Sequence, residues 1–284
     1  MTISQNNSKI DHYAVMGNPI AHSKSPMIHA AFAQQTGQAL HYDAILVGSQ
    51  KGEFAQAVQT FQASGGNGLN ITVPFKQEAW ALANQRSQRA ERAGAVNTLW
   101  FDEQGQMIGD NTDGVGLVRD LIQNHRGQIE GQRLLILGAG GAVRGVLAPL
   151  LEAAPARCMI ANRTLSKAET LAERFAALGN VTASPYDALK KQSFDLIING
   201  TSASLQGQLP PLPDGLLAKY GWCYDMMYSN TTTPFVQWAQ TQGAEQALDG
   251  LGMLVEQAAE SFYLWRGIRP NTGPVIEKVR EYLQ

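Results

Sequence analysis

The chain has 284 residues and a formal net charge of −2, from 22 Lys and Arg against 24 Asp and Glu. This length exceeds the size at which one hydrophobic core usually keeps growing, so two domains are predicted. The near balance of charges, without a local cluster of Lys and Arg, argues against the broad basic face that nucleic-acid binding requires. A small or neutral molecule is therefore the expected partner, and no nucleic acid is expected.

Two further features bear on the cellular compartment. Cys158 and Cys223 each lie in an apolar, strand-like run, which suits a reduced interior better than a secreted disulfide framework. Residues 1–12 are polar and lack a charged segment leading into an apolar one, so no signal peptide is expected. No apolar run approaches the roughly 20 residues that span a bilayer. The protein is expected to be cytoplasmic, with no membrane partner.

The first half alternates predicted strands and helices. Ser25 is expected to cap a helix whose first position is Pro26, a place that suits the fixed φ of proline, and Gly37 is expected to end it. The other predicted elements are strands over 13–17, 41–47 and 68–73, helices over 51–64 and from about Gln77, and a hairpin over 97–102 and 106–110. The order β-α-β-α-β predicts a mostly parallel sheet covered on both faces.

A second alternating series follows the helix that begins after Asp113. Strands are predicted over 133–138, 157–162, 194–200 and 221–226, and helices over 141–151 and 166–178. Pro149 lies inside the first of these helices and should bend its axis. The loop over 201–215 is rich in Ser, Pro and Gly, and it is expected to be exposed. Two closing helices, over about 251–266 and 274–283, could belong to either half.

The sequence "LLILGAGGAVRG" (134–145) places Gly138, Gly140 and Gly141 between an apolar strand and a helix. Glycines permit the tight turn and let a pyrophosphate approach the backbone, while the free N–H groups of the helix N-terminus attract its negative charge. The strict G-x-G-x-x-G pattern fails, because its third glycine falls on Val143. A βα turn can also use glycine merely for its positive φ, so the turn alone is weak evidence.

The end of the next strand favours one dinucleotide over the other. About 20 to 25 residues beyond the first glycine, an NAD site would carry an acidic residue for the ribose hydroxyls. Asn162 occupies this place, followed by Arg163, Thr164 and Lys167. An arginine can bind a 2′-phosphate that a carboxylate would repel, so NADP is the predicted cofactor. In the alternative interpretation, Asn162 and Thr164 cap the helix and Arg163 is solvated.

Six spaced motifs, together with "NRT" (162–164), carry a family resemblance over nearly the whole chain. The motifs are "GNPIAHSKSPMIHAAF" (17–32), "NITVPFK" (70–76), "GAVNTL" (94–99), "GDNTDGVG" (109–116), "GAGGAVRG" (138–145) and "DGLGMLVEQAA" (249–259). In this order they closely resemble the shikimate dehydrogenases. The resemblance implies NADPH-dependent reduction of 3-dehydroshikimate to shikimate, in the pathway to chorismate and aromatic amino acids. It also implies a substrate domain over 1–113, completed by C-terminal helices over 250–284, and a Rossmann domain over 114–249.

The resemblance also implies the site residues. Ser23 and Ser25 would bind the substrate carboxylate, Ser25 with free N–H groups at a helix start. The remaining substrate contacts would be Thr72, Asn97, Tyr228 and Gln257. Cofactor contacts would come from Gly138, Ala139, Gly140, Gly141, Ala142, Asn162, Arg163, Thr164, Lys167, Met226 and Gly250. No metal site is predicted, and a homodimer is possible but cannot be recognised from the sequence.

Lys76 and Asp113 match the family's catalytic pair. Hydride addition to a carbonyl carbon leaves charge on the oxygen, so an ammonium group within hydrogen-bond reach can stabilise that charge and supply the proton. A nearby Asp113 carboxylate would orient the lysine and hold it charged. Taken singly, Lys76 could be a surface residue and Asp113 an N-cap; the ordered motifs favour catalysis.

Two alternative functions stay open. A quinate/shikimate dehydrogenase would accept an extra hydroxyl on the substrate and tolerate NAD, although Asn162 and Arg163 speak against an NAD preference. A non-catalytic sensor of NADP or shikimate would control a partner protein. The presence of Lys76 and Asp113 disfavours the sensor.

Overall fold

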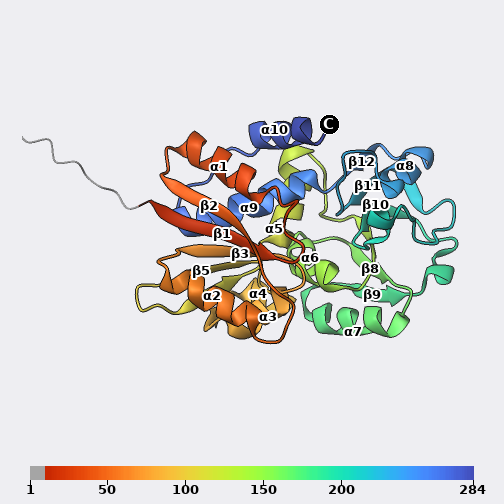
Figure 1. The fold of residues 1–284 in the computed structure, drawn as a ribbon. Helices are drawn as coiled ribbons and strands as arrows, with labels where there is room; N and C mark the ends of the chain where they lie inside the picture. The colour runs from red at the N-terminus through yellow and green to blue at the C-terminus, as the bar shows by residue number, and fades with distance from the viewer. Residues whose placement is uncertain (1–9) are drawn as a thin grey trace, which may run out of the picture.

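The computed structural model describes residues 10–284. The expectation that the chain has no signal peptide concerns residues 1–12, most of which lie outside the described residues. Two six-stranded sheets stand side by side, with helix α5 (Asp113–Arg119) between them (Figure 1). No helix of residues 10–284 is long and apolar enough to cross a membrane. The fold is α/β, as predicted.

The first sheet has the strand order β2-β1-β3-β5-β6-β4. Its strands are β1 (Asp11–Gly17), β2 (Leu40–Leu46), β3 (Gly68–Ile71), β4 (Gln85–Arg86), β5 (Thr98–Phe101) and β6 (Met107–Asp110). The accompanying helices are α1 (Ser25–Thr36), α2 (Glu53–Ala63), α3 (Lys76–Leu82) and α4 (Gln88–Ala93). The strands β2, β1 and β3 pair in parallel, whereas the predicted hairpin makes β5 antiparallel to both β3 and β6.

The second sheet is parallel throughout, with the order β12-β11-β10-β7-β8-β9. Its strands are β7 (Arg133–Leu137), β8 (Arg157–Ala161), β9 (Val181–Ser184), β10 (Phe194–Asn199), β11 (Leu217–Asp225) and β12 (Gln246–Leu248). The helices are α6 (Gly141–Glu152), α7 (Leu165–Phe175) and α8 (Pro234–Thr241), with 3₁₀ turns at Ala176–Leu178, Tyr186–Leu189 and Ala203–Gln206. Both faces are covered, which explains why the central strand β7 is apolar and buried at each of its positions after Arg133.

Helices α5 (Asp113–Arg119), α9 (Leu251–Arg266) and α10 (Gly273–Leu283) complete the fold, with a π-helical turn over Asp120–Asn124. Helices α9 and α10 share a buried apolar cluster with α1, in which Phe32 and Phe262 are fully buried. Burying a side chain of this size contributes about 1.5–3 kcal/mol. The packing attaches the C-terminal helices to the first half, and the domain bounds 1–113, 114–249 and 250–284 stay a prediction.

Several local expectations differ from the structure. Helix α1 begins at Ser25 with Lys24 in the N-cap position, so Ser25 does not cap it. Strand β3 ends at Ile71, because the backbone then turns through a hydrogen bond from the Phe75 N–H to the Thr72 carbonyl. The sequence analysis missed the short elements β4, α4, β9, α8 and β12. Helix α6 runs through Pro149 without interruption, and the kink there stays a prediction. The loop over 201–215 is mostly exposed, as expected.

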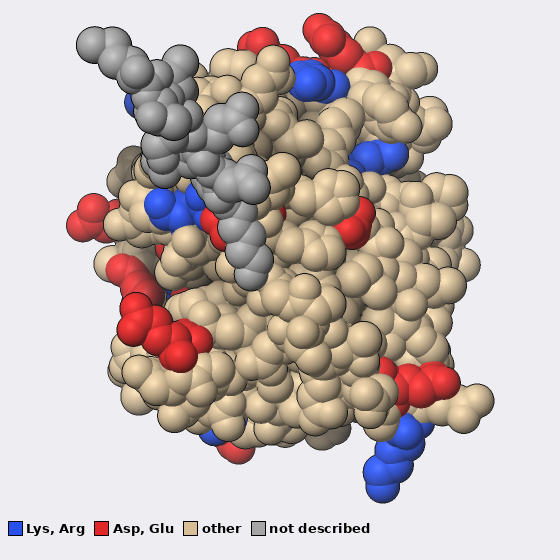
Figure 2. Space-filling view, turned by 60° about the vertical axis from the view of Figure 1, so that its left-hand side comes forward, with Lys and Arg blue, Asp and Glu red and all other residues tan. Residues whose placement is uncertain are grey.

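The surface view in Figure 2 shows Lys, Arg, Asp and Glu in small, separate groups, with most of this face formed by other residues. Both cysteines are free and buried, and burial raises the pKa of each thiol to about 12. The thiols therefore stay protonated and unreactive at neutral pH. This agrees with the expectation that neither takes part in a disulfide framework.

Candidate active site

The stretch "NITVPFK" carries the chain from β3 into α3. Phe75 is buried and stacks on Phe54 of α2, with ring centroids 5.0 Å apart and an interplanar angle of 9°. This contact anchors the start of α3, so the next residue, Lys76, leaves the core at the first turn of the helix. Its Nζ lies 2.6 Å from Oδ2 of Asp113. Residues 37 positions apart thus form a short ion pair.

Asp113 is the first residue of α5, after β6, and Thr112 rather than Asp113 occupies the N-cap. Its Oδ2 accepts from Lys76, and its Oδ1 accepts a hydrogen bond from Nδ2 of Asn97 at 2.8 Å. The side chains of Lys76 and Asp113 are 29% and 12% exposed. A partly buried pair with one further fixed donor has few alternative positions, so the ammonium group is held in place.

The ion pair lies in a cavity of about 350 Å³. The lining includes ten of the predicted site residues: Ser23, Ser25, Thr72, Lys76, Asn97, Asp113, Met226, Tyr228, Gly250 and Gln257. These residues come from the loops beside β3 and β5, from the beginnings of α1, α3 and α5, from α9, and from the loop after β11. The volume is that of a small-molecule site, and hydroxyl and amide groups line it together with the ammonium group of Lys76 and that of Lys24.

A buried polar network behind this cavity was not found by the sequence analysis. Tyr42 donates to Oδ1 of Asn70 at 2.7 Å, and Nδ2 of Asn70 donates to Oγ of Ser261 at 3.0 Å. Ser261 lies 2.7 Å from the hydroxyl of Thr98, which donates to Oδ1 of Asn97 at 2.9 Å. The network therefore leads to the residue that holds Asp113. Asn70, a buried amide within a short strand, was the one available sequence signal.

The loop after β11 closes the cavity from the side of the second sheet. Tyr228 is half-buried, and burial raises the pKa of its hydroxyl, so it stays neutral at neutral pH and can donate a hydrogen bond. At Gly250 a Cβ atom would collide with the carbonyl oxygen of Met226. Only glycine lets the start of α9 approach this loop so closely.

The glycine turn joins β7 to α6. Gly138 has a φ of +102°, which favours glycine, and Gly140 is the N-cap of α6. Cβ atoms at Gly140 and Gly141 would meet no neighbour within 4 Å, so the backbone here is open to a ligand. Val143, at the place of the missing third glycine, is fully buried and packs against Gly200. Its side chain belongs to the core and does not block the turn.

The predicted 2′-phosphate residues lie at the neighbouring strand end. Ala161 of β8 pairs with Leu137 of β7, so the segment after β8 emerges beside the glycine turn. Nδ2 of Asn162 donates to the carbonyl oxygen of Thr164 at 2.8 Å and fixes this segment. Arg163, Thr164 and Lys167 are exposed. The open helix N-terminus and the cationic side chains of Arg163 and Lys167 fit a dinucleotide that carries an additional phosphate.

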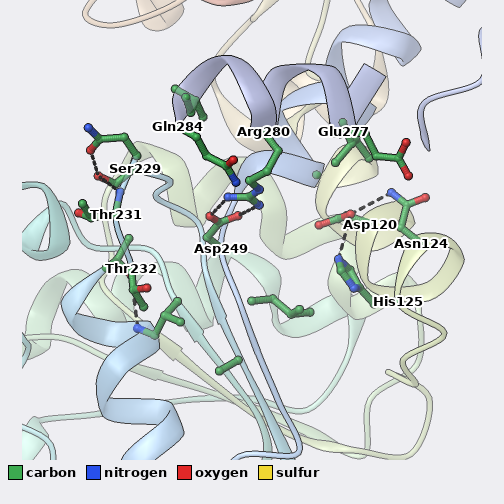
Figure 3. Close-up of a pocket in the computed structure, with 18 of the residues that line it drawn as sticks. Asp120, Asn124, His125, Ser229, Thr231, Thr232, Asp249, Glu277, Arg280 and Gln284 are labelled. Carbon is green, nitrogen blue, oxygen red and sulfur yellow. Dashed lines mark hydrogen bonds and ion pairs between the residues drawn. The ribbon is translucent and has the colours of Figure 1, made fainter. Parts of the chain in front are cut away.

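A larger cavity, of about 680 Å³, lies elsewhere and contains none of the predicted site residues (Figure 3). In it, Nη2 of Arg280 donates to Oδ1 of Asp249 at 2.7 Å. Asp120, on the same lining, accepts a hydrogen bond from the buried hydroxyl of Tyr224 at 2.6 Å. This cavity thus has an ion pair of its own, Arg280 with Asp249, but its lining contains no residue that the sequence predicts for the site.

Together, the parallel sheet with its glycine turn and the adjoining charged cavity define an α/β protein of the dinucleotide-binding class. Models of three family regions match the chain: shikimate dehydrogenase substrate binding domain over residues 15–99, shikimate / quinate 5-dehydrogenase over 120–206, and shikimate 5′-dehydrogenase C-terminal domain over 250–280.

Curated relatives extend this similarity to the whole chain. A shikimate dehydrogenase (NADP(+)) of Cellvibrio japonicus is 61% identical, covering 96% of this chain and 98% of the relative, and that of Nitrosococcus oceani is 58% identical over 95% of each. The solved shikimate 5-dehydrogenase of Thermus thermophilus, in complex with NADP(H) and shikimate, is 31% identical with a TM-score of 0.85, covering 96% of this chain and all of that one. The chain belongs to the shikimate dehydrogenase family, and the two curated relatives are oxidoreductases named for NADP(+).

Proposed function

We propose that this protein catalyses the NADPH-dependent reduction of 3-dehydroshikimate to shikimate, a step toward chorismate and the aromatic amino acids. The observation that carries the proposal is the 2.6 Å pair of Lys76 and Asp113 within the cavity of about 350 Å³. The similarity to NADP-dependent shikimate dehydrogenases over nearly the entire chain supports the same substrate and cofactor.

The polar groups around the pair suit a ring that carries a carboxylate and several hydroxyls. Ser23 and Ser25 lie at the start of α1, where backbone N–H groups favour a negative charge, so we assign them to the carboxylate. The ring hydroxyls are assigned to Thr72, Asn97, Tyr228 and Gln257. Oε1 of Gln257 already accepts from Nδ2 of Asn97 at 3.2 Å, so these two amides can share one hydroxyl.

NADPH supplies the hydride when it is bound. Its phosphates are assigned to the glycine turn over 138–142 and its 2′-phosphate to Arg163, with Asn162, Thr164 and Lys167 alongside. Met226 and Gly250 are assigned to the nicotinamide side of the site. Lys76 donates a hydrogen bond to the substrate carbonyl oxygen, stabilises the charge that develops there, and transfers the proton. Asp113 orients Lys76 and favours its charged form.

The catalytic assignment predicts that Lys76→Ala lowers kcat by about 10²–10⁴-fold with little change in KM for shikimate. The loss occurs in kcat because the ammonium group acts on charge that develops only in the transition state. Steady-state assays of NADP reduction, followed by NADPH absorbance, measure both constants. Lys51→Ala, at an exposed lysine outside the cavity, is the matched control. A kcat near that of the control would remove Lys76 from the mechanism.

Substrate breadth is the second question, since one matching family model covers both shikimate and quinate dehydrogenases. The assay compares four pairs, shikimate or quinate with NADP or NAD. We expect shikimate with NADP to give the highest kcat/KM of the four. Comparable rates with quinate and NAD would favour a quinate/shikimate dehydrogenase. Binding of NADP or shikimate without turnover would favour a non-catalytic sensor. We also propose that the protein is located in the cytoplasm, because both of its cysteines are free and buried, as is usual in a reducing compartment.

A further inference from the structure

A cluster of two histidines and one aspartate lies on the first sheet, outside the cavity assigned to the substrate. His12 of β1 and His41 of β2 are register partners in a parallel pair. Asp43 follows two residues after His41, so it projects from the same face of β2. His12 packs against Phe61 of α2, which identifies this face as the one that α2 covers. The three side chains thus gather at one edge of the sheet.

The contacts bring three donor atoms to one point. Nε2 of His12 lies 2.8 Å from Oδ2 of Asp43, and Nε2 of His41 lies 3.0 Å from Oδ1. The ligand atoms of all three residues fall within 4.8 Å of one another. Both imidazoles therefore present the same ring nitrogen to a single carboxylate. A metal ion with bonds of about 2.0–2.2 Å to nitrogen and oxygen could replace these hydrogen bonds after small side-chain shifts.

One ligand is held in place and two can adapt. The His12 side chain is 33% exposed and packs against Phe61, with ring centroids 5.0 Å apart. Its backbone N–H donates to Oδ1 of Asn67 at 2.8 Å. His41 and Asp43 are 64% and 44% exposed, so solvent reaches the point where the donors meet. Exposed side chains can shift to coordinate an ion, and water can fill its remaining positions.

We propose that His12, His41 and Asp43 form a binding site for a divalent transition metal ion, Zn²⁺ or Cu²⁺. Two imidazoles and one carboxylate suit these ions, whereas Mg²⁺ and Ca²⁺ prefer oxygen ligands alone. The site lies at the beginning of β1, while Val15 near the other end of the strand lines the substrate cavity. A bound ion would cross-link the edge strand β2 to β1 and stabilise the fold without entering the reaction.

The test titrates the full chain, freed of metal with a chelator, with Cu²⁺ and records electron paramagnetic resonance spectra. We expect one Cu²⁺ per chain, with hyperfine structure from two nitrogens in the wild type and from one nitrogen in His41→Ala. Asp43→Asn should weaken binding by about 10-fold or more. The control His125→Ala, which removes a histidine outside the cluster, should leave affinity and spectrum unchanged.

Zn²⁺ provides an independent measurement on the same proteins. Saturating Zn²⁺ should raise the Tm of the wild type and of His125→Ala by a few degrees, and that of His41→Ala by much less. NADP reduction with shikimate should not change upon Zn²⁺ addition, so failure of the metal site is distinguishable from failure of the proposed enzyme activity. Equal Cu²⁺ spectra for wild type and His41→Ala, or the absence of saturable binding, would overturn the proposal.

Discussion

At the scale of single residues, His29 shows how completely the core of the first half excludes water. It is fully buried, stacks on Tyr42 with ring centroids 4.2 Å apart, and has no hydrogen-bond partner for either ring nitrogen within the described residues. Burial lowers the pKa of His29 to about 3 from an ordinary 6.5. The imidazole therefore stays neutral in the folded protein at every pH near neutrality.

This burial predicts acid sensitivity. Below pH 6.5 the unfolded chain binds a proton at His29 that the folded chain does not, so stability present above 6.5 is lost as the pH falls toward 3. The slope is about 1.4 kcal/mol per pH unit, or about 2 kcal/mol between pH 6.5 and 5. Urea unfolding at both pH values should show a smaller decrease for His29→Phe. The exposed-site control His22→Phe should keep the wild-type decrease, and identical decreases in all three proteins would contradict the assignment.

Arg163 carries the residue-scale prediction for the cofactor. It is exposed beside the glycine turn, where a guanidinium group can form charge-assisted hydrogen bonds with a 2′-phosphate. We expect Arg163→Ala to raise KM for NADP by about 10-fold or more, with little change in KM for NAD, because NAD lacks that phosphate. Steady-state kinetics with both cofactors check this. An equal increase in KM for NADP and for NAD would show that Arg163 does not bind the 2′-phosphate.

At the scale of elements, α5 and α6 pack unusually closely because Gly114 faces α6. A Cβ at Gly114 would lie 2.6 Å from Cγ of Pro149 and 2.9 Å from the carbonyl oxygen of Gly145. In a helix the Gly145 carbonyl would accept a hydrogen bond from the N–H of residue 149, but proline has no N–H. The closely packed backbone of α5 covers this carbonyl instead. The proline that seemed to conflict with a helix is therefore part of a helix–helix contact, which residue spacing alone does not show.

The contact predicts that Gly114→Ala destabilises the protein despite the better helix propensity of alanine. Overpacking costs about 1–3 kcal/mol, whereas the propensity gain is at most about 1 kcal/mol. Gly273→Ala is the matched control, because a Cβ there would lie 3.7 Å from its nearest neighbour, an ordinary contact. Urea denaturation should give a lower midpoint for Gly114→Ala and an unchanged or higher one for the control. A neutral Gly114→Ala would show that the two helices can separate at little cost.

The sequence predicted long periodic elements better than short ones. Strands such as β7 and helices such as α7 carry their own hydrophobic pattern, so their positions follow from residue spacing. The two-residue strand β4 exists because it pairs with β6, and no local pattern encodes it. The cavity residues were found through family motifs. Tyr42 and Ser261 were missed because each joins the polar network only through contacts between distant segments.

At the scale of the whole molecule, the proposed reaction needs both halves at one place. Lys76 and Asp113 belong to the first half, and the glycine turn and Tyr228 to the second. Between the halves, the side chains of Arg92 and Glu152 form an ion pair from α4 to α6, and Nη2 of Arg174 donates to the carbonyl oxygen of Glu91 at 3.0 Å. Each of these exposed contacts contributes little, so they would oppose a movement of α4 against α6 only weakly when ligands bind.

We therefore predict that NADP and shikimate together draw the two halves closer around the cavity that contains Lys76, because excluding water strengthens the interaction between Lys76 and the developing charge on the substrate oxygen. Small-angle X-ray scattering should show a smaller radius of gyration with both ligands than without them. Lys76→Ala should bind both ligands and compact equally, since its defect is expected in the chemical step and not in affinity. An unchanged radius in the wild type at saturation would contradict closure. Compaction of the wild type alone would mean that Lys76 itself holds the closed state.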